Sequence, residues 1–186
     1  MALLTVGDLK TEFNKSDASH DDLLLALAES VQSLFGELTN RVIESAIFTE
    51  YHSIGSRGDK IFLKNIPVIS ITSIYDDPDW DYTSNDLLSS SDYTYDADSG
   101  IVYYDGYLFV GHNNIKVTYV AGHTVNTLPE SWKQIWIRQA MHWFNEAKNK
   151  SHGQTSINIP GGSTTKKELT DGLLPDFYAL VEKERL

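Results

Sequence analysis

Four closely spaced aspartates are the side chains best placed to do chemistry: Asp76, Asp77, Asp79 and Asp81. The last three occupy the first, third and fifth positions of a calcium-loop template. Tyr82 stands where that loop requires a glycine, and Leu88 stands where it requires a bidentate glutamate. The sequence therefore excludes an EF-hand and predicts a solvated acidic loop, with weak cation binding as the minor alternative.

The other groups that could act in catalysis or metal binding lack the spacing that such sites need. Six histidines are scattered without paired ligand spacing, and the chain contains no cysteine. No phosphate-binding glycine loop, dinucleotide fingerprint or nucleophile elbow occurs. The sequence therefore predicts a protein that is not an enzyme and has no metal site and no cofactor. An active site assembled from scattered Asp and His residues is the least favoured alternative.

The charge of the chain is acidic and unevenly distributed. The formal net charge is −11, from 15 Lys and Arg against 26 Asp and Glu. Residues 1–125 carry −12, with 7 basic against 19 acidic side chains, whereas residues 126–186 carry +1. An acidic surface repels phosphates, which disfavours a protein that grips DNA; solubility alone is the other explanation. The N-terminus lacks a signal-peptide pattern, and no apolar run approaches the ~20 residues of a membrane span.

Two helices are predicted before the centre of the chain. The first covers residues 5–14 and begins with Thr5 and Asp8 at capping-box spacing. The same spacing recurs in Ser19-His-Asp-Asp22, at the start of a second helix over residues 20–39. Apolar residues recur along the second helix at intervals of three and four. We expect this stripe to lie in the core.

A β-region is predicted over residues 46–120. Its centre is the stretch 61–77, which is rich in β-branched residues and is interrupted once, by Pro67. Because proline cannot donate to a strand ladder, Pro67 should stand at a strand start or edge, with Val68–Tyr75 as the following strand. Further short strands follow, and Asp105-Gly106 is typical of a two-residue hairpin turn.

A third helix is predicted over residues 129–148, and it carries tryptophans at helical spacing. These indicate either core or a subunit interface: Trp132, Trp136 and Trp143. Residues 149–172 are rich in Gly, Ser, Thr and Lys, which is typical of an extended arm, and a short amphipathic helix follows from Pro175.

These elements together predict an α+β fold. N-terminal helices and the long third helix pack with an inserted antiparallel β-meander, followed by an extended C-terminal arm and a short terminal helix. Residues 1–148 are expected to form one domain, and residues 149–186 the arm and the terminal helix.

The order of these segments resembles the head–tail connector family, also called adaptor or head-completion proteins, of long-tailed double-stranded-DNA bacteriophages. The resemblance runs from about residue 3 to residue 148, with a weaker echo in residues 173–186. After the two N-terminal helices it is carried by residues 62–77, 92–96, 99–103, 115–122 and 128–134. Each segment is unspecific alone, but the ordered set is fairly specific.

The resemblance implies a non-enzymatic virion protein of the phage neck, assembled in the host cytoplasm. Such adaptors form a closed ring, typically a dodecamer, beneath the portal, extend the DNA channel and present a docking surface for the stopper or tail. Double-stranded DNA would pass through without sequence-specific binding, and no membrane is involved. The acidic loop (Asp76, Asp77, Asp79, Asp81) would face a neighbouring subunit, the lumen or the tail.

The long β-region and the C-terminal arm depart from the simplest members of that family. The arm is basic and glycine-rich and ends in a separate helix, so we expect it to reach toward the portal. The residues expected there are Ile157, Ile159, Phe177, Tyr178, Leu180 and Val181. The alternative is that Phe177, Leu180 and Val181 fold back on the helices of their own chain.

A second class of function stays open. The β-region could act as a monomeric binding module that recognises a carbohydrate or a protein ligand through aromatic faces. The side chains expected to serve in that case are Tyr93, Tyr95, Tyr103, Tyr104 and Tyr107.

Overall fold

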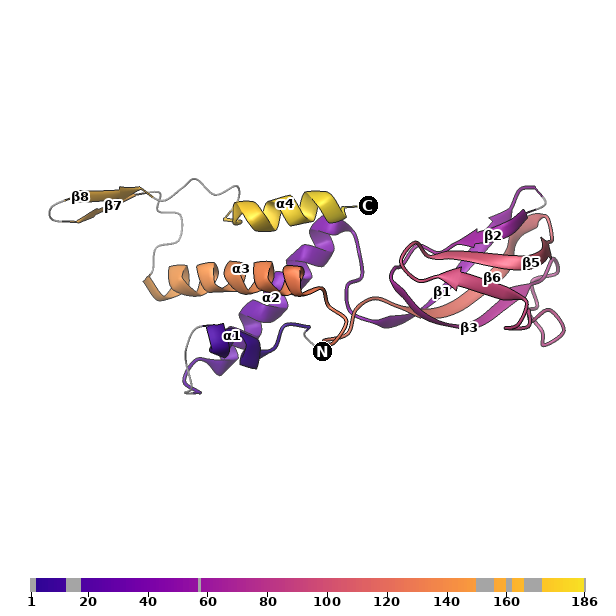
Figure 1. The fold of residues 1–186 in the computed structure, drawn as a ribbon, viewed down its shortest axis with the longest axis horizontal. Coiled ribbons are helices and arrows are strands. Elements are labelled where there is room, and N and C mark those ends of the chain that lie inside the picture. The colour runs from indigo at the N-terminus through magenta and orange to yellow at the C-terminus, as the bar shows by residue number, and fades with distance from the viewer. Residues whose placement is uncertain are drawn as a thin grey trace. The chain divides into compact units, whose positions relative to one another are not determined.

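A computed structural model gives the fold, and it describes residues 3–12, 18–56, 58–149, 156–159, 162–165 and 172–185. The chain divides into two compact units (Figure 1). Met1–Arg41 and Val125–Leu186 form the first, called the helical unit, and Val42–Thr124 form the second, called the β unit. The described residues form helices and antiparallel sheets, which confirms the predicted α+β class.

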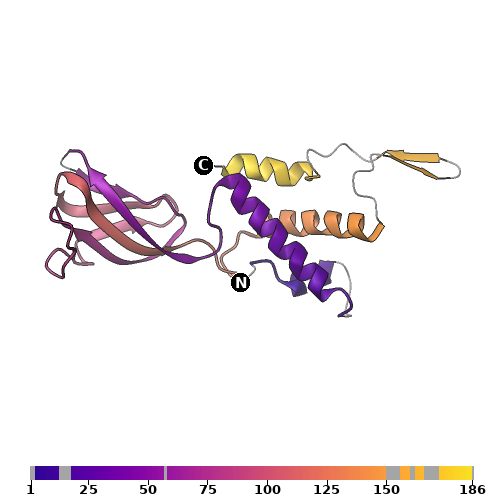
Figure 2. The same cartoon turned by 180° about the vertical axis from the view of Figure 1, so that it is seen from behind.

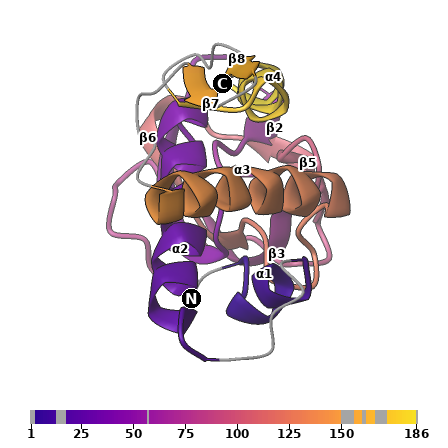
Figure 3. The same ribbon diagram turned by 90° about the vertical axis from the view of Figure 1, so that its left-hand side faces the viewer.

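The helical unit contains four helices within the described residues, and Figures 2 and 3 show them from two further directions. They are α1 (Val6–Glu12), α2 (Asp21–Thr39), α3 (Glu130–Asn149) and α4 (Pro175–Glu184). α2 runs across α3 in Figure 3. The described part of the C-terminal arm includes two paired strands, β7 (Ser156–Ile159) and β8 (Gly162–Thr165).

One of the two predicted helix caps is present. The Thr5 N–H donates to Asp8 Oδ2 at 2.9 Å, and the Asp8 N–H donates to Thr5 Oγ1 at 3.1 Å, which is the reciprocal pattern of a capping box. The prediction for Ser19 is wrong, because α2 begins at Asp21 after His20 and has no side-chain cap. The Ser19 hydroxyl instead hydrogen-bonds His20 Nδ1, at 2.6 Å.

Phe35 is the centre of the core in the helical unit. Its ring is fully buried and lies 5.1 Å from Trp132, 5.2 Å from Trp136 and 5.9 Å from Phe177, measured between ring centroids. These contacts join α2, α3 and α4 through one side chain. The apolar stripe of α2 therefore lies in the core, as its spacing predicts.

The β unit is built from two three-stranded antiparallel sheets. One has the order β1–β6–β3 and the other β2–β5–β4, so strands far apart in the chain are paired. The core lies between the sheets, because its buried residues come from β2, β3, β5 and β6. The strands are β1 (Ala46–Ile54), β2 (Gly58–Phe62), β3 (Val68–Asp76), β4 (Tyr93–Asp96), β5 (Ile101–Leu108) and β6 (Gly111–Ala121).

Of two expectations about the β unit, one about a strand and one about a turn, the structure confirms the first and contradicts the second. The predicted strand after Pro67 is confirmed, since β3 begins at Val68. The predicted hairpin at Asp105-Gly106 is wrong, because both residues lie inside β5 and the Asp105 N–H donates to the Asp92 carbonyl at 2.8 Å. The Tyr104 ring covers Gly106, where an added Cβ would lie 2.6 Å from a ring carbon. A larger residue there would make the Tyr104 ring shift, so this glycine is related to packing and not to a turn.

A polar network attaches the loop before β3 to the first sheet. Glu50 accepts hydrogen bonds from the Tyr119 hydroxyl, from the Lys64 N–H at 3.2 Å and from Asn65 Nδ2 at 3.0 Å. His52 Nε2 lies 3.2 Å from the same carboxylate. Burial alone raises the pKa of Glu50, but these hydrogen bonds outweigh it and lower the pKa to about 2. Glu50 is therefore ionised at neutral pH and holds the loop in place.

Candidate binding pocket on the β unit

Most of the residues expected to contact a partner through α4 are buried in the helical unit. Phe177 is 0% exposed, Leu180 8% and Val181 3%, so the structure has the fold-back arrangement that the sequence left open. Tyr178, on the same helix, is 44% exposed. Ile157 and Ile159 lie in β7, whose backbone pairs with β8.

The three tryptophans of α3 differ in their surroundings. Trp132 and Trp136 are buried in the core around Phe35. Trp143 is half-buried, and its Nε1 donates to the Gly172 carbonyl at 3.3 Å. Of the two roles that the sequence indicated, the structure thus gives Trp132 and Trp136 the core role.

Two of the four predicted loop aspartates face inward and organise the loop. Asp76 is 6% exposed; it accepts the Phe109 N–H at 2.9 Å and Asn114 Nδ2 at 3.0 Å. Asp77 is 2% exposed and accepts the Asp79 N–H at 2.7 Å and the Tyr82 N–H at 2.6 Å. These bonds fold the chain back on itself directly after β3.

The other two predicted aspartates, Asp79 and Asp81, are exposed. Carboxylate oxygens of Asp77, Asp81 and Asp86 lie within 4.8 Å of one another, and oxygen ligands of this kind suit a hard cation. Partial desolvation by the surrounding loop and the neighbouring Asp77 carboxylate raise the pKa of Asp81. Each Asp77 oxygen already accepts one backbone N–H, which leaves one lone pair on each oxygen for another partner.

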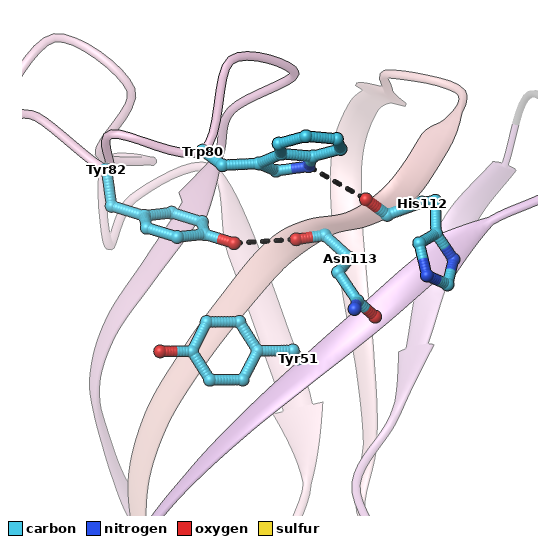
Figure 4. Close-up of a pocket in the computed structure, with 5 residues that line it drawn as sticks. All are labelled: Tyr51, Trp80, Tyr82, His112 and Asn113. Carbon is cyan, nitrogen blue, oxygen red and sulfur yellow. Dashed lines mark hydrogen bonds between the residues drawn. The ribbon is translucent and has the colours of Figure 1, made fainter.

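A pocket of about 380 Å³ lies beside this loop (Figure 4). It is lined by Tyr51 of β1, by Trp80 and Tyr82 of the loop, and by His112 and Asn113 of β6. The pocket lies toward the Ile54–Gly111 end of the β1–β6 ladder. The chain enters and leaves the β unit at the opposite end, where Ala46 pairs with Ala121.

Hydrogen bonds to the backbone of β6 fix both aromatic rings of the loop. Trp80 Nε1 donates to the His112 carbonyl at 2.8 Å, and the Tyr82 hydroxyl donates to the Asn113 carbonyl at 2.6 Å (Figure 4). Trp80, Tyr82 and Asn113 all have positive φ angles, of 66°, 47° and 53°. Such angles cost energy for residues other than glycine, and they cluster at binding sites.

A lysine lies on the sheet face next to the pocket. Lys116 is paired with Tyr51 on β1 and with Tyr75 on β3, and its Nζ lies 5.0 Å from the centroid of the Tyr82 ring. The ammonium also lies 5.7 Å from the Tyr75 ring centroid, which is cation–π geometry. The β unit otherwise carries strong negative charge, with 12 acidic against 4 basic residues between Val42 and Thr124.

The tyrosines expected to form a binding surface are not the ones that line this pocket. Tyr95, Tyr103 and Tyr107 are exposed, whereas Tyr93 and Tyr104 are half-buried. Tyr93 and Tyr95 line a separate depression of about 390 Å³ with Ser70, Ile71, Ser90 and Thr94. The sequence signal that could have found the main pocket is the presence of Trp80 and Tyr82 in an otherwise acidic, serine-rich loop.

No helix among the described residues combines the length and apolar character needed to cross a membrane. No family model and no curated protein sequence matches the chain.

Solved structures of phage-like particles contain chains with a similar fold. A chain from the neck of an empty gene transfer agent (GTA) particle, computed with C6 symmetry, has a TM-score of 0.59 at 14% identity and covers 98% of this chain and 89% of that one. A chain from the neck of the native GTA particle, computed with C12 symmetry, gives 0.56 at 16%, covering 97% and 90%. A chain from the virion of the native particle gives 0.58 at 17%, covering 98% and 89%. At these identities the likeness shows that this chain has the fold of those GTA chains.

Proposed function

We propose that this chain is a structural protein of the neck of a phage-like particle, where its copies form a closed ring between the portal of the DNA-filled head and the stopper or tail. The observation that carries the proposal is the likeness over 97–98% of the chain to chains from GTA neck structures computed with C6 and C12 symmetry. The likeness covers both units, so it does not rest on the helices alone.

The charge of the chain supports a channel role. The net charge is −11, and the β unit accounts for −8 of it. A duplex that moves through a ring must not be held by lysines and arginines, since each phosphate contact adds affinity. An acidic inner surface would let DNA pass without sequence-specific binding.

We place the contact with the portal on the exposed side of α4 and on the C-terminal arm. Tyr178 is the exposed aromatic of α4, and Ile157 and Ile159 of β7 lie in the arm. Phe177, Leu180 and Val181 serve this contact indirectly, because their burial fixes α4 on the helical unit. The exposed loop residues Asp79 and Asp81 are available to a neighbouring subunit, the lumen or the tail.

The test is co-expression of the full chain with the portal protein of the same particle, followed by native mass spectrometry and electron microscopy. We expect a ring of twelve copies on the portal, as the C12 symmetry of the similar neck suggests. A Tyr178→Ala variant should weaken that complex, and a Gln134→Ala variant on the exposed side of α3 is the matched control. A chain that stays monomeric in the presence of portal would contradict the proposal.

A further inference from the structure

We propose that the pocket lined by Tyr51, Trp80, Tyr82, His112 and Asn113 binds a neutral pyranose ring, such as the terminal sugar of a polysaccharide. This inference concerns the β unit alone and does not rest on the proposed neck role. It is argued from the size of the pocket, from its aromatic faces, from the unpaired polar groups beside them and from the charges nearby.

The size and the aromatic faces suit one sugar ring. A volume of about 380 Å³ is at the low end for small-molecule sites, which typically span ~300–1,000 Å³. Trp80 is 58% exposed and Tyr51 is 50% exposed. Trp80 is nevertheless held in place by its hydrogen bond to the His112 carbonyl. The electron-rich face of an aromatic ring attracts the electropositive C–H groups on the flat side of a pyranose.

The tryptophan and the second tyrosine are fixed before any ligand arrives. Trp80 Nε1 and the Tyr82 hydroxyl both donate to backbone carbonyls of β6, so their polar atoms are satisfied within the protein. What Trp80 presents to a ligand is therefore the face of its ring. A ring that is already immobilised loses little conformational freedom on binding, which favours affinity.

Three polar groups of the lining have no partner among the described residues. They are the Tyr51 hydroxyl, His112 Nε2 and Asn113 Nδ2; His112 Nδ1 is occupied by the Ser53 hydroxyl at 3.0 Å. Together they offer donors and acceptors beside an aromatic face. A sugar hydroxyl both donates and accepts, so it can pair with each of these groups in turn.

The nearby charges disfavour an ionic ligand of either sign. A cation would find no carboxylate among the lining residues and would meet the Lys116 ammonium, which lies 5.0 Å from the Tyr82 ring. An anion would meet a unit with net charge −8 and the exposed carboxylates of Asp79 and Asp81. An extended peptide is disfavoured because the His112 and Asn113 carbonyls already accept hydrogen bonds from Trp80 and Tyr82. A neutral, hydroxyl-rich ring meets none of these obstacles.

The chain offers a sharp probe, because Trp80 is one of four tryptophans and is the only one in the β unit. We would label the full chain with fluorotryptophan, identify the Trp80 signal as the one lost in Trp80→Phe, and titrate neutral sugars by fluorine NMR. The panel is methyl β-glucoside, methyl β-galactoside, methyl α-mannoside and N-acetylglucosamine. We expect at least one sugar to shift the Trp80 signal alone, with a Kd of ~1 mM.

Variants and charged analogues complete the test. Tyr51→Ala should weaken binding at least ~10-fold, whereas Tyr107→Ala, an exposed tyrosine outside the pocket, should leave it unchanged. A methyl glucuronide should bind more weakly than the matched glucoside. Absence of any Trp80 shift up to about 50 mM sugar would overturn the proposal. A shift with tetramethylammonium or with a proline-rich peptide, and none with sugars, would also overturn it.

Discussion

Gln139, on the buried side of α3, fixes the residue that precedes α4: its Oε1 accepts the Leu174 N–H at 2.8 Å. Its Nε2 donates to the Gly172 carbonyl at 3.2 Å, and Trp143 Nε1 donates to the same carbonyl at 3.3 Å. One buried amide therefore fixes the residues directly before α4, which begins at Pro175.

Gln139→Leu should loosen α4. The change leaves the part-buried Leu174 N–H without its side-chain acceptor, and an unpaired polar group costs up to about 1–3 kcal/mol when buried. We expect lower stability in urea and faster hydrogen exchange in α4. Gln134→Leu is the control, because Gln134 is exposed on the same helix and its side-chain amide donates to the exposed neighbour Glu130. Equal stability of the two variants would contradict the role given to Gln139.

Adjacent residues of α4 should behave in opposite ways. Phe177→Ala removes a fully buried ring that lies 5.9 Å from Phe35, and such a truncation costs about 3–5 kcal/mol. Tyr178→Ala removes a ring that is 44% exposed, so its effect on the free energy of unfolding should stay within about 0.5 kcal/mol. Chemical denaturation of both variants measures the contrast. Similar losses for the two would show that α4 is not docked as described.

The local features that the sequence predicted correctly are those set by short-range chemistry. The Thr5–Asp8 cap needs only residues three apart, and the apolar stripe of α2 needs only helical periodicity. The strand after Pro67 follows from its β-branched composition. Each of these could be predicted because the sequence signal lies within one short segment of the chain.

What the sequence could not supply depends on pairing between distant segments. The Asp105-Gly106 pair resembles a turn, but it continues β5, where the Asp105 N–H donates to the carbonyl of Asp92, directly before β4. The pocket draws Tyr51 from β1, Trp80 from a loop and His112 from β6, and no short motif encodes that meeting. The order β1–β6–β3 is likewise a property of the folded unit.

The Glu50 network should make the β unit sensitive to acid. The pKa of Glu50 is lowered from 4.5 to about 2 in the folded state. Its stabilising contribution is therefore complete above pH 4.5 and is lost as the pH falls from 4.5 toward 2. Because the Glu50 carboxylate is partly open to water, we expect the loss to be about 1–2 kcal/mol.

Glu50→Gln tests this directly, since glutamine keeps the shape of the side chain but cannot ionise. The variant should be less stable at pH 7, and its stability should vary less with pH between 4.5 and 2 than that of the unaltered chain. Asp59→Asn, which changes an exposed acidic residue of β2, is the control for loss of one acidic charge. Parallel pH profiles for the unaltered chain and Glu50→Gln would contradict the assignment.

Asp77 should control the order of the pocket without lining it. Its two oxygens accept the Asp79 and Tyr82 N–H groups, which fold the loop so that Trp80 and Tyr82 reach β6. Asp77→Ala removes both acceptors, so the Trp80 fluorine signal should broaden and the Tyr82 amide should exchange faster. Asp79→Ala keeps the Asp79 backbone N–H, and the Asp79 side chain is exposed. This control should therefore change neither the Trp80 signal nor the exchange rate of the Tyr82 amide.

Because the Asp77 carboxylate orders the loop, the order of the loop should depend on pH. Burial alone raises the pKa of Asp77, but the Tyr82 and Asp79 N–H groups outweigh it and lower the pKa below the usual 3.8. The ordering contribution of Asp77 is then present above pH 3.8 and is lost as the pH falls through its lower folded value. The Trp80 signal of the unaltered chain should therefore come to resemble that of Asp77→Ala as acid is added. A Trp80 signal that stays sharp in acid and in Asp77→Ala alike would show that the loop is held without this carboxylate.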